Sequence, residues 1–319
     1  MKLLLNVILI CIFNYTILGQ QEQQYSQYLI NPFTINPAVS STEDYIDVQS
    51  GYRAQWNGLE GSPKTAYATA YKTLGKPFYH LHHAHEHKNW HGIGMHIYND
   101  QTGPIQRNAL LLAYSYNMPL FKKTRLSFGS FMGIKRLKTN SDYWKDIEDN
   151  TDILFSQDQS SGVKPEIQLG AVMYSENYFF TLAAHNLVAK NIKFSSTEAQ
   201  GIKDYKTHLF LSGGYIFRTS EKVKITPSVL MKYVVNAPIS LDLNMKIDHN
   251  SKYWYGTSAR IKESVNIFAG VRLKSLIDIT YAFEWSLSKL NSHNSGTHEI
   301  ILGLRLKHPN IVLDPSRYW

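Results

Sequence analysis

The stretch Ile239-Ser240-Leu241-Asp242-Leu243-Asn244-Met245-Lys246-Ile247-Asp248 alternates apolar and polar residues without a break. Because successive side chains of a β-strand point to opposite faces, this stretch predicts a strand with one apolar face and one charged face. A second run, from Ile277 to Trp285, repeats the pattern. A soluble sheet also alternates in this way, so the pattern predicts strands without deciding which solvent surrounds them.

Residues 1–19 have the features of a secretory signal peptide. Lys2 supplies the positive end, residues 3–13 form the apolar stretch, and Gly19 is a small residue ahead of a cut before Gln20. Cys11, the one cysteine, lies inside this segment, so we expect no thiol site in the exported chain. The formal net charge of +8 becomes +7 when Lys2 is removed, and its basic residues are scattered, which argues against nucleic acid as a partner.

Strand and turn signals predict about fourteen strands and no domain boundary between them. No apolar run of eighteen residues follows the signal segment, which excludes helical membrane spans, whereas most predicted strands have the length that a tilted strand needs to cross a bilayer. We therefore expect an all-β fold, a single closed antiparallel transmembrane β-barrel over residues 44–307. A signal peptide (1–19) and an N-terminal extended segment (20–43) precede it, and a tail (308–319) follows. The predicted strands are 44–55, 65–74, 92–100, 106–118, 125–138, 164–174, 177–187, 206–217, 223–235, 238–249, 252–262, 264–274, 276–288 and 297–307.

Connection lengths, aromatic residues and charges support the membrane interpretation. The even-numbered connections are mostly short and two odd-numbered ones, 139–163 and 188–205, are long, as in bacterial outer-membrane barrels; the stretch 75–91 is an exception. We expect an aromatic girdle where the apolar band meets the headgroups. Its predicted members are Tyr52, Tyr67, Tyr71, Tyr98, Tyr114, Tyr116, Tyr215, Tyr233, Tyr253, Trp254 and Tyr255. Charges recur on the opposite face and would line the lumen of a barrel, although a soluble β-sandwich would place them outside. They are Glu166, Lys232, Asp242, Lys246, Asp278, Glu284, Glu299 and Arg305.

Several motifs lie in a characteristic order along the chain. QYLINPFTINPA (27–38) is followed by YRAQW (52–56) and GSP (61–63), and later by PSVL (227–230), Lys232-Tyr233, APISLDLN (237–244) and GTHEI (296–300). In this order and over nearly the whole mature chain, they resemble the PorP/SprF family, which is associated with the type IX secretion system of Bacteroidota. One departure is the C-terminal end, where the family commonly has a Cys-Pro pair and this chain has Asp314-Pro315.

The resemblance implies an outer-membrane barrel that serves type IX secretion, with secretion components and a large surface adhesin as its partners and outer-membrane lipid around it. Residues that carry the resemblance, or that would contact a partner, are Asn31, Pro32, Asn36, Pro37, Arg53, Trp56, Pro63, Pro227, Lys232, Asp242, Glu299 and Trp319. The two Asn-Pro steps would either bind a partner or form turns that pack the segment against or inside the barrel, and we favour turns. Likewise, Arg53 and Trp56 would either recognise a ligand or serve as a lumen charge and a girdle aromatic, and we favour the second interpretation.

No residue pattern indicates an active site, a cofactor or a required metal. Six histidines lie within residues 80–91, but their spacing matches no structural zinc motif, so we favour a solvated connection over a metal site. No Gly-x-Ser-x-Gly, His-Glu-x-x-His or phosphate-binding loop is present, and we expect no enzyme.

Two functions remain in competition. The first is a scaffold for export or surface attachment of an adhesin, with 139–163, 188–205 and 308–319 as the expected partner surfaces. The second is a transport channel for small or hydrophobic solutes, since a barrel of this size encloses a lumen and Asn36-Pro37-Ala38 is similar to the hatch of long-chain fatty-acid transporters.

Overall fold

A computed structural model describes residues 26–76, 88–121, 123–139, 161–188, 192–193, 201–202, 206–288, 291 and 293–306. Within these ranges the chain is almost wholly β-structure, joined by turns and preceded by two short 3₁₀-helices. None of the helices in these ranges is long and apolar enough to cross a membrane.

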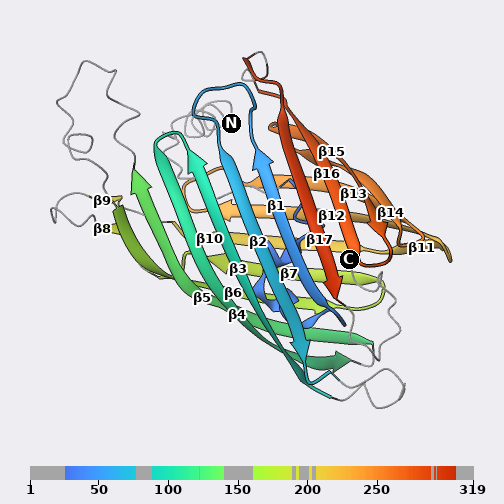
Figure 1. Cartoon of the computed structure of the whole chain (residues 1–319). Coiled ribbons are helices and arrows are strands. Elements are labelled where there is room, and N and C mark those ends of the chain that lie inside the picture. The colour runs from blue at the N-terminus through green and yellow to red at the C-terminus, as the bar shows by residue number, and fades with distance from the viewer. Residues whose placement is uncertain are drawn as a thin grey trace, which may run out of the picture.

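Fourteen antiparallel strands close into one barrel (Figure 1). Each strand pairs with the next along the chain, β1 pairs with β17, and a pairing between β10 and β12 completes the ring. The fourteen strands are β1 (Ile46–Ala54), β2 (Lys64–Leu74), β3 (Trp90–Thr102), β4 (Ile105–Phe121), β5 (Thr124–Thr139), β6 (Ser161–Tyr174), β7 (Tyr178–His185), β10 (His208–Tyr215), β12 (Val223–Val234), β13 (Ser240–His249), β14 (Tyr253–Arg260), β15 (Ser264–Leu273), β16 (Ile277–Ser286) and β17 (Thr297–Leu306). All fourteen predicted strands are confirmed.

Three further strands are short and leave the ring unchanged. β11 (Phe217–Ser220) continues the line of β10 beyond Ile216 and pairs with β12. The other two, β8 (Ile192–Lys193) and β9 (Gly201–Ile202), pair only with each other, inside the connection that joins β7 to β10.

The two faces of the wall are apolar outside and polar inside. In β13, Leu243 and Met245 are exposed, whereas Asp242, Asn244 and Lys246 are buried. This is the reverse of a soluble sheet, which buries its apolar face. The alternation therefore places lipid outside and the charged face in the lumen, and the protein is an outer-membrane β-barrel.

The predicted aromatic girdle is only partly correct. Tyr52, Tyr114, Tyr215, Tyr233, Tyr253 and Tyr255 point outward and are exposed, and Tyr116 is partly exposed. Four other members of the predicted girdle are buried and face inward: Tyr67, Tyr71, Tyr98 and Trp254. In β2 both tyrosines share the inner face with Thr65 and Thr69, because side chains two residues apart lie on the same side of a strand.

The barrel has two rims, which we name by strand β1. The first rim is the one where β1 begins at Ile46, and the second rim is the one where β1 ends at Ala54. Turns at the first rim are short, as expected, apart from the connection 75–89 between β2 and β3. The second rim also has a two-residue turn, Gly103-Pro104, between β3 and β4. Residues 77–87 of the long stretch 75–91 and most of the two long loops lie outside the described residues. By the rule of short periplasmic turns, we expect the first rim to face the periplasm.

A charge on the outer face should destabilise the barrel in a depth-dependent way. Ile267, 59% exposed on β15, faces outward within the apolar band, and Ile239, 60% exposed, lies just before β13 at the second rim. We expect Ile267→Lys to lower the free energy of unfolding by about 2–4 kcal/mol and the matched Ile239→Lys by about 0–1 kcal/mol. Urea unfolding in lipid vesicles measures both, and equal losses would contradict the placement of the apolar band.

Candidate functional site

Residues 26–43, which we call the lumen segment, lie inside the barrel, where Figure 1 draws them in blue. Two 3₁₀-helices, η1 (Pro32–Thr34) and η2 (Pro37–Ser41), form within it. Each begins with the proline of an Asn-Pro step, since proline has its φ preset and needs no N–H partner at a helix start. The Asn36 side chain caps η2 by accepting a hydrogen bond from the Ala38 N–H at 3.0 Å. The segment that we expected to be extended is therefore largely turned.

The lumen segment runs lengthwise through the barrel. Ser26 bonds Glu284 and Glu299, which lie in the halves of β16 and β17 nearer the second rim. Ser41, in contrast, bonds Ser127 close to the first-rim end of β5. The chain thus descends from the second-rim half to the first rim, where β1 begins.

Every one of the fourteen wall strands contributes a hydrogen bond or an apolar contact to the segment. Backbone or side-chain hydrogen bonds come from Gln49, Thr69, Trp90, Ser115, Ser127, Ala171, Leu182, Asn244, Asn266, Glu284 and Glu299. The remaining three strands contribute Phe210, Leu230 and Trp254, which belong to apolar clusters with Tyr28, Leu29 or Ile30. Contact with the full circumference means that the segment fills the lumen cross-section instead of lying against one wall.

Paired hydroxyls and glycines form the seat of η2. Ser40 and Ser41 place their Oγ atoms 2.8 Å from those of Ser115 and Ser127. The backbone of η2 also approaches the wall so closely that a Cβ at Gly129 would lie 2.6 Å from the Ala38 nitrogen. A Cβ at Gly170 would collide with the Asn36 amide oxygen. These two wall positions therefore require glycine because the lumen segment is there.

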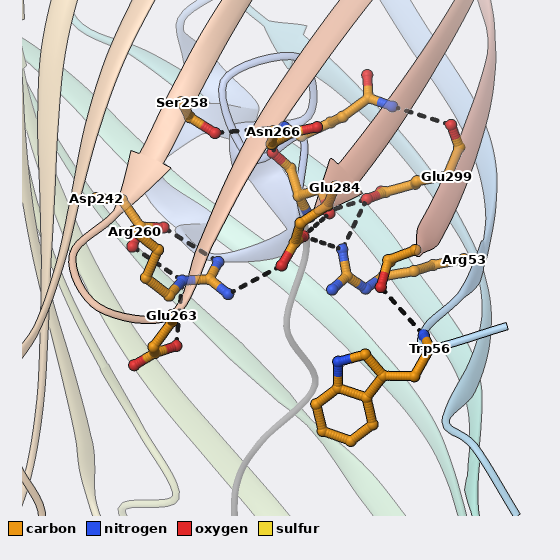
Figure 2. A network of polar contacts seen from close by, with 12 residues as sticks. Arg53, Trp56, Asp242, Ser258, Arg260, Glu263, Asn266, Glu284 and Glu299 are labelled. Atoms are coloured by element: carbon orange, nitrogen blue, oxygen red, sulfur yellow. Dashed lines mark hydrogen bonds and ion pairs between the residues drawn. The ribbon is translucent and has the colours of Figure 1, made fainter. Parts of the chain in front are cut away.

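A buried charge network holds the other end of the segment (Figure 2). Arg53, 1% exposed, places Nη1 3.0 Å from Glu284 Oε2 and 3.6 Å from Glu299 Oε2. Ser26 donates its backbone N–H to Glu299 at 2.8 Å and its hydroxyl to Glu284. The two buried carboxylates thus share one guanidinium, and both are bonded by Ser26, the first described residue of the chain.

Arg260 extends this network across the wall. Figure 2 shows its guanidinium between Asp242, at 2.9 Å, and Glu284, at 3.6 Å, with Glu263 at 3.7 Å. Separate clusters lie elsewhere in the lumen: Glu166 pairs with Lys164 and Lys135, and Asp278 pairs with Arg272 and Arg305. Burying charges without partners costs several kcal/mol, so the grouping of opposite charges makes this lining tolerable in a filled lumen.

Within the described ranges, no three His, Cys, Asp or Glu side chains are grouped as metal ligands. Most of the histidine-rich stretch lies outside these ranges; its last member, His91, bonds the Tyr114 hydroxyl at 2.7 Å. Among the described residues, Glu166, Asp242, Asp278 and Glu284 each pair with an Arg or Lys side chain, and these ion pairs hold the wall strands together.

Two cavities beside the segment are small. One, of about 40 Å³, lies over Tyr28 and Ile35 and is lined by Gln168, Lys232, Asp242 and Arg260 among others. The other, of about 30 Å³, lies nearer the first rim beside Leu29 and Ile30. A water molecule needs about 10–15 Å³ on this measure, so each cavity has room for only two to four waters.

The structure brings most of the expected signature residues to the lumen, in different roles. Asn31 donates to Thr69 at 2.9 Å, and Asn36 donates to the carbonyls of Ala171 and Leu182 at 3.1 Å each. Pro32 and Pro37 begin the two 3₁₀-helices. The Asn-Pro steps are thus buried turns, which leaves these side chains inaccessible to a partner in this conformation.

The YRAQW motif divides between two environments. Arg53 and Glu299 belong to the buried network, as the lumen-charge interpretation expects. Trp56 does not lie on the first strand: β1 ends at Ala54, and Trp56 has a positive φ of 51° in the turn that follows, with its N–H bonded to Thr297. Pro63 precedes β2, and its carbonyl accepts the Gln55 N–H at 2.9 Å.

The remaining signature residues are scattered. Pro227 lies in β12 opposite the break between β10 and β11, where the ladder is interrupted and a missing N–H costs little. Lys232 and Asp242 line the same cavity. Trp319 lies outside the described residues.

Ser40, Ser41, Ser115 and Gly170 were missed by the sequence reasoning. Only one signal was available in the sequence: a small residue on the inward-facing side of a predicted strand, as at Ser115, Ser127 and Gly129. Such residues are common in turns and strands of any barrel, so the signal becomes specific only when the segment opposite them is known.

Filling the glycine seat should displace η2. We expect Gly129→Ala to destabilise the folded protein by about 1–3 kcal/mol through overpacking, because its Cβ would overlap the Ala38 backbone. Gly213→Ala is the matched control, since the nearest atom to its Cβ is 3.6 Å away. Thermal unfolding in detergent compares the two, and an equal loss for both variants would mean that η2 does not sit on Gly129.

Removing the shared guanidinium alone should destabilise the protein more than removing it together with the charge of Glu299. We expect Arg53→Met to destabilise by about 3–5 kcal/mol, because it leaves Glu299 buried without a cation. The double variant Arg53→Met with Glu299→Gln should recover part of this loss, since the uncompensated charge is gone. Urea unfolding measures both; a double variant less stable than Arg53→Met alone would contradict the charge-balance argument.

Solved structures with a similar arrangement are distant outer-membrane barrels. The monoaromatic hydrocarbon channel CymD is 10% identical, covering 91% of this chain and 95% of that chain, with a TM-score of 0.49. The Ralstonia pickettii toluene transporter TbuX is 9% identical, covering 85% of this chain and 92% of that chain, with a TM-score of 0.48. The translocator domain of the Neisseria meningitidis autotransporter NalP is 10% identical, covering 82% of this chain and 87% of that chain, with a TM-score of 0.41. At this distance none of them indicates what this chain carries or binds.

A comparison with curated proteins found no match. The family of type IX secretion system membrane proteins PorP/SprF, in contrast, matches residues 17–304, which include the whole barrel apart from its last strand residues. Of the motifs that resemble this family, QYLINPFTINPA lies in the lumen segment, and YRAQW and GTHEI contribute Arg53 and Glu299 to the buried charge network. The chain therefore belongs to the PorP/SprF family of type IX secretion system membrane proteins.

Proposed function

We propose that this barrel is a scaffold for export or surface attachment of a partner adhesin, and that solutes do not pass through its lumen. Membership of a type IX secretion family associates the barrel with components of that system. The single observation that carries the scaffold role is the lumen segment, which contacts all fourteen wall strands. A channel needs a continuous passage, whereas a scaffold needs a rigid wall that presents its rims.

The contacts at both ends of the lumen segment support the proposal that it fills the lumen permanently. Its η2 end is fixed by two hydroxyl pairs and by Asn36, and its Ser26 end by two buried carboxylates. Withdrawing the segment would break the Ser26 hydrogen bonds to Glu284 and Glu299 at one end. At the same time it would break the two serine pairs at the other end. Partner surfaces then belong to the rims, and the connections 139–163 and 188–205 and the tail 308–319 are the candidates.

A disulfide between segment and wall tests whether the segment must move. The mature part of the chain has no cysteine, and Ser41 and Ser127 have their hydroxyls 2.8 Å apart, so the double variant Ser41→Cys with Ser127→Cys should form a bond on oxidation. We expect the locked protein to support the same surface level of co-encoded adhesins as the two single variants. Loss of surface adhesin on oxidation, restored by a reductant, would instead favour a lumen that opens.

Deletion of each candidate surface locates the partner contact. We expect loss of 139–163, 188–205 or 308–319 to lower the surface level of the adhesin while the barrel still assembles, as heat-modifiable migration on gels reports. Single-channel recordings on the purified barrel address the alternative of a transport channel. A steady conductance in the disulfide-locked protein, or unchanged adhesin in all three deletions, would overturn the scaffold proposal.

A further inference from the structure

The smaller cavity, near the first rim, has an unusual lining. It lies under Leu29 and Ile30 of the lumen segment, and the wall contributes Lys246, Arg272 and Arg305. These three cations lie close to the first-rim ends of β13, β15 and β17. Two aspartates, Asp248 and Asp278, complete the charged lining, which therefore has three positive and two negative groups.

Both aspartates are already engaged. Asp278 receives Arg272 through two contacts, at 2.7 and 3.0 Å, and Arg305 at 2.8 Å. Asp248 accepts the Ser251 N–H at 2.9 Å and so closes the turn after β13. Glu43 and Asp47, which do not line the cavity, attract the Arg305 guanidinium electrostatically.

Lys246 is the one cation of this lining that forms no ion pair with a described residue. It is 8% exposed, and among the described residues its ammonium makes no hydrogen bond and no ion pair. Asp248 and Asp278 attract it through space, but neither carboxylate lies within ion-pair distance. Its side chain is more than nine-tenths buried and lines the cavity, so a group that pairs with the ammonium there would gain interaction energy.

We propose that this cavity binds a carboxylate, which pairs with Lys246 beside Arg272. The volume of about 30 Å³ has room for about two waters. A carboxylate, with three non-hydrogen atoms, is close to this size, whereas a phosphate or sulfate is larger. Gln49 also lines the cavity, and its buried amide oxygen has no hydrogen-bond donor among the described residues.

Two sources could supply this chemistry: a small free carboxylate, or an acidic side chain of a polypeptide that reaches in at the first rim. Trp254 lines the cavity, and its ring lies 5.5 Å from the Arg272 guanidinium, so its fluorescence reports on charge bound there. The probes are acetate and a glutamate blocked as N-acetyl methylamide, titrated into the detergent-solubilised barrel at constant ionic strength made up with chloride. The difference between the native protein and Trp254→Phe isolates the signal.

We expect a saturable change for both probes in the native protein and at least a tenfold weaker affinity in Lys246→Met. Lys252→Met is the matched control, because it removes an exposed lysine at the same rim and should bind as the native protein does. Equal affinity for the two probes would assign the site to free carboxylates, and tighter binding of the blocked glutamate would assign it to a polypeptide side chain.

The proposal is overturned if the native protein gives no saturable change, which would mean that the cavity holds water only, or if Lys246→Met binds as the native protein does. A folding defect is separated by melting without added carboxylate. Since Lys246 has no partner to lose, we expect the melting temperature of Lys246→Met to equal or exceed that of the native protein, and a clear decrease would also overturn the proposal.

Discussion

The charged side chains on the inner face of the barrel need hydrogen-bond and ion-pair partners, and this requirement governs the structure. An outer-membrane barrel that turns its apolar residues to lipid must turn the alternate, polar residues inward, and here many of them are charged. A wide lumen would leave these groups to water, whereas this chain supplies its own partner in residues 26–43. Hydrogen bonds from the wall to this segment and ion pairs between wall strands share the task.

The two ends of the lumen segment are held by different chemistry. Around η2 the contacts are short, neutral and steric, with serine pairs and glycines that admit the backbone. Around Ser26 they are ionic, with Arg53 shared between two glutamates. Neutral close packing depends little on salt, whereas the ionic end is shielded from salt only because it is buried. The segment thus links the packing of the first rim to the electrostatics of the second.

A filled lumen also shapes what the family relationship can mean for function. In the part of the chain that the structure describes, no three His, Cys, Asp or Glu side chains are grouped as metal ligands, and Asp242 and Asp278 pair with arginines. Under the proposed scaffold function, the barrel presents its rims to other molecules. In the first-rim cavity, Lys246 of the lining forms no ion pair with a described residue.

The sequence by itself determined the strands, their number and their closure into a membrane barrel, because alternation with a period of two is local and survives any tertiary context. It also identified Arg53, Glu299 and the Asn-Pro steps as important, through motifs. Only the tertiary structure decided that Tyr67, Tyr71, Tyr98 and Trp254 face inward, that Trp56 leaves the strand, and that Ser41 meets Ser127. The physical reason is that these outcomes depend on what lies across the lumen, and a segment that crosses it makes contacts with residues up to 273 positions away, which no local pattern encodes.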